Sequence, residues 1–231
     1  MSAALEPAPP IERAGRFGLH ADAGSLVLGA TRWLVPVALL GGLAAIVAAR
    51  WSATRAGIDP LAVGAMFGLL LAALALGAHV SRRRARDRAT RAGDGLEVVR
   101  AAAIGVFFGL VLVGLVIVGA AIAGAQLVPG LGRPAADFAA WVAITILVAS
   151  AEEALLRGRL FDALRRAGGL LPAVAVTTVA FALMHVPLYG WHVVPLDLAV
   201  GLAFAGLRLA TGGVVAPAAA HSTADLATWW L

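Results

Sequence analysis

The chain consists mainly of long apolar runs separated by short polar segments. A helix that spans a bilayer needs about 20 mainly apolar residues. The runs that reach or approach this length are residues 33–49, 61–80, 101–128, a run from about 136 into Glu152 and Glu153, 170–186, 196–210 and 214–231. This pattern predicts an all-α fold, a polytopic transmembrane bundle of about seven spanning helices.

Composition agrees with a membrane protein. Of the 231 residues, 61% are hydrophobic, whereas soluble domains are about 45–50% apolar. The chain has no cysteine, which excludes disulfides, thiolate metal sites and a cysteine nucleophile. Residues 1–25 mix proline, charge and small side chains and lack the apolar core of a cleavable signal peptide. We interpret them as a flexible cytoplasmic tail.

The positions of the arginines predict the orientation. All 18 basic residues are arginine. If the N-terminus is cytoplasmic, only Arg50, Arg55 and Arg133 lie outside, and the other 15 lie inside. Cytoplasmic loops are enriched in arginine, so this bias predicts a multi-pass protein of the cell membrane with its C-terminus outside. We interpret the basic run at residues 81–91 as a loop attracted to anionic lipid, and we expect no nucleic-acid partner.

Two further patterns concern packing. Gly64 with Gly68, and Gly105 with Gly109, have GxxxG spacing inside apolar runs, which allows neighbouring helices to approach closely. The six tryptophans lie near the ends of predicted spans, where indole rings prefer the headgroup region. Neither pattern indicates a ligand.

The candidate chemistry lies in the last third of the chain, where Glu152, Glu153, His185 and His221 interrupt apolar runs. A charge at the bilayer centre costs at least about 2.5–3.5 kcal/mol, so such residues are rare and are functional candidates. On a helix, Glu153 faces Arg157 at i+4 and can pair with it. Glu152 points about 100° away and has no evident local partner, which suits a general base. The alternative is a Glu–Arg network that caps the helix.

Two histidine motifs follow. In one, Phe181 and His185 share a helix face just before Pro187, which we expect to end the span. In the other, His221 and Asp225 stand at i and i+4 in the last run. Taken alone, each motif favours a structural role over catalysis: a packed, hydrogen-bonded histidine in the first, and a helix-stabilising pair in the second.

Depth decides whether these residues can meet. His185 lies 15 residues beyond the start of its run, about 22 Å from the cytoplasmic edge. Glu152 reaches a similar depth, about 20 Å, only if the fourth helix continues to Arg165 and so has nearly 30 residues. We prefer this geometry. Counted from Gly213, His221 lies only about 12 Å deep and is expected nearer the mouth of the site.

The three clusters, in this order, resemble the CAAX protease and bacteriocin-processing family of intramembrane proteases, also called Abi proteins. The family pattern is EExxxR, FxxxH and HxxxN, and this chain matches it except that Asp225 replaces the asparagine. The resemblance covers roughly residues 137–231. It divides the chain into the tail (1–25), N-terminal transmembrane helices (26–134) and a catalytic core (135–231).

The resemblance implies that Glu152 and His185 activate a water against a peptide carbonyl, while His221 and the last motif position stabilise the oxyanion. An ionised Asp225 would repel that oxyanion, so Asp225 would be protonated or turned aside. A buried carboxylic acid can be held neutral for such a role. In the alternative mechanism, Glu152, His185, His221 and Asp225 are candidate ligands of a metal such as zinc. We favour the metal-independent mechanism.

Either mechanism predicts an intramembrane endopeptidase acting on a membrane-associated protein or peptide. The first alternative is a non-catalytic immunity or scaffold protein of the same fold, which the Asp225 substitution favours. A transporter ranks third, because no pair of broken, symmetry-related helices is evident. The catalytic candidates are Glu152, Glu153, Arg157, His185, His221 and Asp225, while the sequence names neither the substrate nor the cleavage site.

Overall fold

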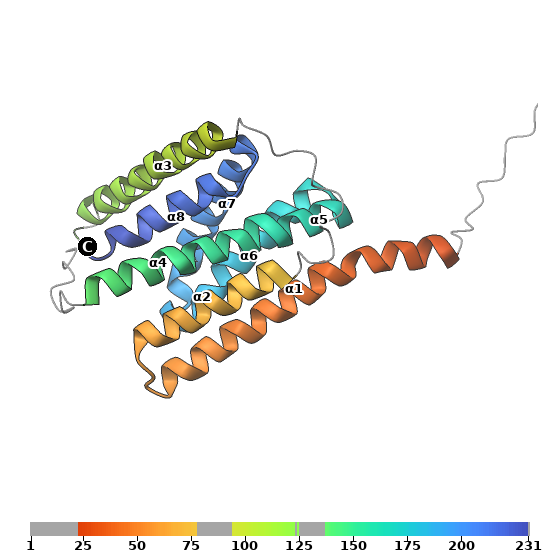
Figure 1. Ribbon diagram of the computed structural model, residues 1–231, viewed down its shortest axis with the longest axis horizontal. Coiled ribbons are helices and arrows are strands. Elements are labelled where there is room, and N and C mark those ends of the chain that lie inside the picture. The colour runs from red at the N-terminus through yellow and green to blue at the C-terminus, as the bar shows by residue number, and fades with distance from the viewer. Residues whose placement is uncertain (1–22, 78–93, 123, 125–136, 231) are drawn as a thin grey trace, which may run out of the picture.

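The computed structural model describes residues 23–77, 94–122, 124 and 137–230 (Figure 1). Every element in these ranges is helical. They are α1 (Ala23–Arg55), α2 (Pro60–Gly77), α3 (Asp94–Ile122), α4 (Phe138–Glu153), the π-helical η3 (Ala154–Leu160), α5 (Phe161–Gly168), α6 (Leu170–Tyr189), the short 3-10 helix η4 (Trp191–Val193), α7 (Val194–Thr211) and α8 (Val215–Ala227). Residues 1–22 of the predicted tail lie outside the described residues. The whole basic run at residues 81–91 also lies outside them.

Six of the described helical segments are long and apolar enough to cross a membrane. They are Thr31–Arg55, Pro60–Gly77, Gly95–Ile122, Phe138–Gly168, Leu170–Tyr189 and Trp191–Thr211. The protein is therefore a multi-pass membrane protein with the predicted helical-bundle fold. The seventh predicted span, residues 214–231, forms the 13-residue α8. This helix ends early because i,i+3 backbone bonds follow it, the first from the Thr228 N–H to the Asp225 carbonyl at 3.1 Å.

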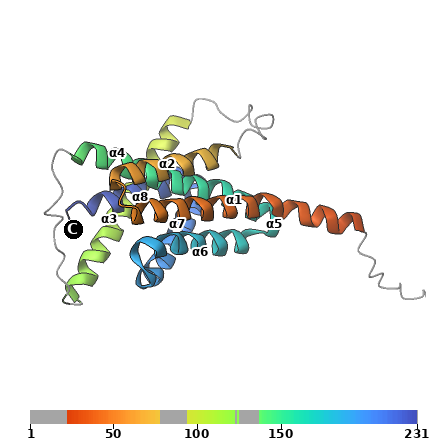
Figure 2. The same cartoon turned by 90° about the horizontal axis from the view of Figure 1, so that it is seen from below.

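Helix α1 is longer than its predicted run of residues 33–49. Its N-terminal part extends past the rest of the bundle in both views (Figures 1 and 2). A Cβ placed on Gly168 would lie 2.8 Å from the Trp33 ring, so Trp33 packs at the end of α5. At the other end of the bundle, Phe138 and Trp141 of α4 pack with Trp229, which follows α8. Trp33 lies near the start of the candidate span Thr31–Arg55, and Trp141 lies near the start of the span Phe138–Gly168, as the sequence predicts.

The fourth span is the long helix that the depth argument requires. It runs without interruption from Phe138 to Gly168, 31 residues, and so passes well beyond Arg157. The sequence did not predict the π-helical segment η3 in its middle. A π-helical turn changes the i→i−4 backbone pairing and is often found at functional sites. Here the carbonyl of Arg157 accepts a hydrogen bond from Nε of Arg208 on α7, at 3.0 Å.

The prediction that Pro187 ends the fifth predicted span is wrong. Helix α6 passes Pro187 and ends at Tyr189. The termination point is Gly190, whose φ of 88° falls in the left-handed region that glycine tolerates. The N–H of Gly190 closes the last turn on the Val186 carbonyl at 2.8 Å. A proline near a helix end removes one N–H, and the glycine that follows sets the boundary.

Both GxxxG pairs lie at helix contacts. Helix α3 runs beside α8 (Figure 1) because Gly105 and Gly109 leave room for the α8 backbone. A Cβ on Gly109 would lie 2.6 Å from the Ala220 carbonyl oxygen, next to His221. On α2, Gly64 and Gly68 similarly accommodate Ile144 and Leu147 of α4. The small residues therefore bring the two helices that carry candidate site residues into the bundle.

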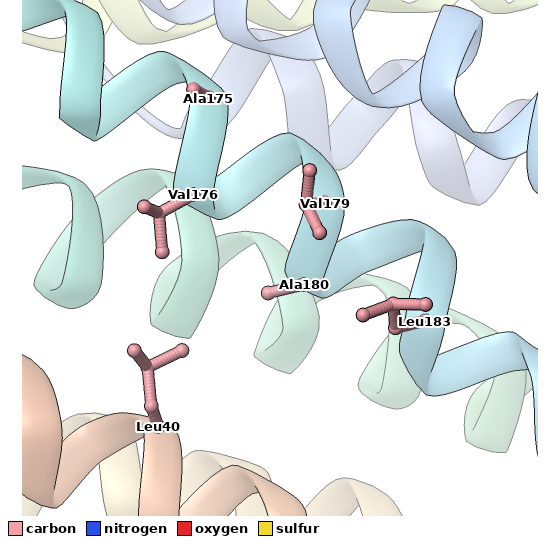
Figure 3. Close-up of a pocket in the computed structure, with 6 residues that line it drawn as sticks. All are labelled: Leu40, Ala175, Val176, Val179, Ala180 and Leu183. Atoms are coloured by element: carbon pink, nitrogen blue, oxygen red, sulfur yellow. The ribbon is translucent and has the colours of Figure 1, made fainter.

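An apolar pocket of about 310 Å³ separates α1 from α6 (Figure 3). Leu40 extends from α1 towards α6, which contributes Ala175, Val176, Val179, Ala180 and Leu183. The lining has no polar side chain and none of the candidate site residues. This pocket is therefore distinct from the candidate active site.

Candidate active site

Two adjacent carboxylates occupy the last turn of α4. Glu152 is 2% exposed and Glu153 is fully buried. Oε1 of Glu153 accepts a hydrogen bond from Nη1 of Arg157 at 2.9 Å, the i,i+4 pair that the sequence predicts. Unpaired buried charges are costly, so this pair accounts for how Glu153 can be held in the bundle.

Arg157 is fully buried and is enclosed by three helices. Its Nη2 donates to the Gly201 carbonyl of α7 at 2.9 Å, and its guanidinium lies 4.7 Å from the centre of the Phe181 ring. A Cβ on Gly201 would come within 3.2 Å of this same nitrogen. Because residue 201 has no side chain, the guanidinium can come close enough to donate to the carbonyl of Gly201. Arg157 thereby ties α4 and η3 to α7.

His221 contacts both carboxylates. Its Nδ1 lies 3.2 Å from Oε1 of Glu153, and its Nε2 lies 3.7 Å from Oε2 of Glu152. In the tautomer with a proton on Nδ1, His221 donates to Glu153 and presents Nε2 towards Glu152. The ring is 6% exposed and also packs against the Phe181 and Phe204 rings. His221 is thus at the centre of the cluster.

The expectation that His221 lies nearer the mouth of the site is wrong, because the residue from which its depth was counted does not lie at the membrane edge. The depth was counted from Gly213 as though the α7–α8 turn were at the membrane edge. In the structure, Val214 packs beside Gly158 of η3, since a Cβ on Gly158 would lie 3.5 Å from Val214 Cγ1. Gly158 stands ten residues before the end of α5, about 15 Å along the helix axis. Helix α8 therefore starts well inside the bundle and places His221 level with Glu152.

Glu152 differs from its neighbour in how it is paired. The Oε2 atoms of both residues are buried and make no hydrogen bond to any of the described residues, but Glu153 is paired with Arg157 through Oε1 and Glu152 has no such partner. The nearest basic group is His221 Nε2 at 3.7 Å, beyond hydrogen-bond distance. The sequence predicts this free carboxylate from the helical angle between Glu152 and Glu153. Glu152 is the carboxylate available to take a proton.

Asp225 marks the more exposed side of the cluster. Its Oδ2 lies 3.4 Å from Nε2 of His221, so the i,i+4 pair predicted on α8 is present. The Asp225 side chain is 44% exposed, compared with 6% for His221. Exposure therefore rises along α8 from His221 to Asp225.

His185 lies beside the cluster and has its own partners. Its Nδ1 is 2.9 Å from the Phe181 carbonyl oxygen and 3.4 Å from Oδ2 of Asp197. The Phe181 ring packs edge-on against both His185 and His221, with ring centroids 4.8 and 5.4 Å away. Among the described residues, no hydrogen bond or ion pair joins His185 to Glu152. The predicted pairing of these two residues would therefore need a bridging group.

Sequence reasoning missed Asp197. It lies in the first turn of α7 and is the acidic partner of His185. A hydrogen bond to one ring nitrogen orients a histidine and fixes which nitrogen is free. The signal was present, because Asp197 is an ionisable residue inside an apolar run, the same criterion that selected the other four.

The proposed zinc ligands do not form a coordination group in this arrangement. Glu152 and His221 are neighbours, whereas Nδ1 of His185 is turned towards Phe181 and Asp197. Among the residues that the structure describes, no set of three or more histidine, aspartate or glutamate side chains is placed to hold a metal ion.

Comparison with known proteins gives one match. Residues 134–227 fit the model of a family described as type II CAAX prenyl endopeptidase Rce1-like. No curated protein and no solved structure matches the chain. The matched range contains all six candidate catalytic residues and excludes α1 to α3. The resemblance of the three sequence clusters to the CAAX protease family is confirmed.

Proposed function

Because residues 134–227 match the family described as type II CAAX prenyl endopeptidase Rce1-like, we propose that the chain is an intramembrane endopeptidase. It hydrolyses a peptide bond in a membrane-associated protein or peptide. The cell membrane is its proposed location, with the bilayer and the substrate peptide as its partners.

One observation carries the proposal. Glu152 Oε2 is buried in the bundle without a hydrogen-bond partner among the described residues, and Glu152 has no arginine partner there, whereas the adjacent Glu153 accepts a hydrogen bond from Arg157 through Oε1 while its own Oε2 is also unpartnered. Buried polar groups are nearly always hydrogen-bonded, so an exception in a cluster of ionisable residues indicates chemistry. A carboxylate shielded from water and not neutralised by an arginine can take a proton from a nucleophilic water.

The proposed reaction is a general-base hydrolysis. A water gives a proton to Glu152 while its oxygen forms a bond to the carbonyl carbon of the scissile peptide. The carbonyl electron pair moves to oxygen and forms an oxyanion. When this intermediate collapses, the C–N bond breaks and the proton held by Glu152 passes to the leaving nitrogen. The products are a new carboxyl terminus and a new amino terminus, so no other reactant is consumed.

The neighbouring residues have supporting roles in this proposal. In this proposal His221 carries a proton on both ring nitrogens in the transition state, so that Nδ1 donates to Glu153 and the Nε2 N–H, next to Glu152, donates to the oxyanion. His185, oriented by Asp197 and the Phe181 carbonyl, assists with the attacking water. Glu153 and Arg157 do not act on the substrate. They hold His221 and α7 in position.

The test is to replace Glu152 by its neutral isostere. We expect Glu152→Gln to lower cleavage of an internally quenched S-farnesyl CAAX peptide in proteoliposomes by at least about 100-fold, the usual minimum for loss of a general base. Glu97→Gln, on an exposed position of α3, is the matched control and is expected to cleave like the wild type. If Glu152→Gln cleaved at the wild-type rate, the assignment would be wrong.

A further inference from the structure

Two aspartates lie on the more exposed side of the candidate site, on neighbouring helices. Asp197 is in the first turn of α7 and Asp225 is in the last turn of α8. Residues 212–214 join these two helices, which pack against each other, so the two turns lie at the same end of the pair. The side chain of Asp197 is 18% exposed and that of Asp225 is 44% exposed, compared with 2% for Glu152. A peptide that enters from the exposed side therefore meets these two carboxylates first.

Within the described part of the chain, each aspartate has a histidine as its ion-pair partner. Oδ2 of Asp197 lies 3.4 Å from Nδ1 of His185, and Oδ2 of Asp225 lies 3.4 Å from Nε2 of His221. Both histidine rings pack edge-on against the Phe181 ring, with centroids 4.8 and 5.4 Å away. The two histidine–aspartate pairs therefore belong to one cluster, with Phe181 between the histidines.

No arginine among the described residues forms an ion pair with either aspartate. Arg157 is paired with Glu153, and Arg50 of α1 stacks on the Phe67 ring of α2. A histidine is a cation only when both ring nitrogens carry a proton. The exposed side of the cluster thus presents two carboxylates that no arginine neutralises by direct contact. Partly buried charges are stabilised when an opposite charge pairs with them, so this side favours a cationic ligand.

A buried atom of the same cluster independently indicates a ligand. Oε2 of Glu152 makes no hydrogen bond to the described residues and lies 3.7 Å from Nε2 of His221. That nitrogen is the one that Asp225 approaches. Buried polar atoms are nearly always hydrogen-bonded, so this atom is directed at a group that the fold does not supply. A ligand that reaches Glu152 is therefore also close to the carboxylates on the exposed side.

We propose that the protein prefers substrate peptides with a lysine or arginine close to the cleaved bond, and that the carboxylates of Asp197 and Asp225 bind this cationic side chain. This inference rests on the proposed function and adds a charge specificity to it. Charges at the rim of a binding site select ligands of opposite charge and repel ligands of like charge. A bound cation also offsets the negative charge that Asp225 places 3.4 Å from His221, which stabilises the oxyanion. An acidic residue at the same place in the peptide is disfavoured.

Matched substrates measure this preference. The internally quenched S-farnesyl CAAX peptide is made with lysine, glutamine or glutamate at one position, which is scanned along the residues around the prenylated cysteine. Cleavage is measured in proteoliposomes of phosphatidylcholine, because anionic lipid would itself attract the cationic peptide. At the best position, we expect the wild-type kcat/KM to be about tenfold higher for lysine than for glutamine, and lower again for glutamate.

The variants assign the preference to the two aspartates. Asp197→Asn and Asp225→Asn are each expected to lower the lysine-to-glutamine ratio of kcat/KM to less than about threefold. The ratio is the informative quantity, because a displaced His185 would slow cleavage of both peptides alike. Glu97→Gln removes an exposed carboxylate of α3 and is expected to keep the wild-type ratio.

Two results would overturn the proposal. One is a wild-type ratio below about twofold at every scanned position, and the other is a preference for lysine that neither aspartate variant lowers. In both cases the peptides are still cleaved, so the proposed function would stand. A wild-type protein that cleaves none of the peptides would instead overturn the proposed function, and this inference with it.

Discussion

Nδ1 of His221 lies 3.2 Å from Oε1 of Glu153, although 68 residues separate them in the chain. The same oxygen accepts the hydrogen bond from Arg157, so one carboxylate holds both the last helix and the buried arginine. Glu153 is committed to structure by these contacts. The adjacent Glu152 makes neither of these two hydrogen bonds, and the proposed mechanism assigns it the role of general base.

The contact between α3 and α8 holds His221 in place. A substitution that adds one methyl group at this contact tests it. Gly109→Ala would put a Cβ 2.6 Å from the Ala220 carbonyl oxygen, a backbone atom that cannot turn aside. Such overpacking typically costs about 1–3 kcal/mol. We expect a lower thermal unfolding midpoint in detergent and reduced peptide cleavage.

Gly114→Ala is the matched control, because a Cβ at Gly114 on the same helix meets no atom within 4 Å. We expect this variant to be neutral or slightly stabilising, since alanine favours a helix by up to about 1 kcal/mol over glycine. Equal stability of the Gly109 and Gly114 variants would contradict the close packing of α3 on α8.

The two adjacent carboxylates are expected to differ in their effect on stability. Glu153→Gln removes the charge partner of a fully buried arginine, and breaking a buried pair typically costs about 3–5 kcal/mol. Glu152→Gln removes no hydrogen bond made to Oε2, so its unfolding midpoint is expected to match the wild type. Thermal unfolding of the two variants in detergent compares them directly. A larger loss of stability for Glu152→Gln would reverse the assigned roles.

The sequence predicted most of the fold because spanning helices depend on local composition. Six apolar runs became helices of spanning length, and the depth argument identified the long fourth helix. The errors occurred where a boundary depends on a few atoms. Gly190 rather than Pro187 ends α6, and i,i+3 bonds shorten α8. No pattern of residue types in the sequence predicts the π-helical segment η3.

The candidate site was only partly predictable for a related reason. The i,i+4 pairs Glu153–Arg157 and His221–Asp225 follow from helical spacing, and both are present. The level of His221 depends on where α8 starts, and the packing of Val214 beside Gly158 fixes that point through tertiary contact. Asp197, the acidic partner of His185, could have been found by the charge criterion.

Replacement of Asp225 by the family residue tests the oxyanion role. We expect Asp225→Asn to preserve peptide cleavage or increase it, because the amide removes a negative charge 3.4 Å from His221 and adds an N–H donor. The measurement is kcat/KM with the internally quenched peptide. A loss of cleavage that no neutral residue at position 225 restores would indicate that the carboxylate itself is required.

Metal content distinguishes the two mechanisms. The water mechanism predicts no stoichiometric zinc in the detergent-purified protein and cleavage that survives a chelator. The comparison protein is the His185→Ala/His221→Ala double variant, which removes both candidate histidine ligands. Near-stoichiometric zinc in the wild type and none in the double variant would contradict the metal-independent mechanism and would make Asp225 a candidate ligand.

The most direct test of the central claim is to compare membranes that contain the wild-type protein with membranes that contain Glu152→Gln. Mass spectrometry of peptide termini would identify bonds cut in one and not in the other. The proposed function predicts new carboxyl termini in membrane-associated proteins or peptides with the wild type, and their absence with Glu152→Gln at equal abundance. Identical termini in both membranes would contradict catalysis by Glu152.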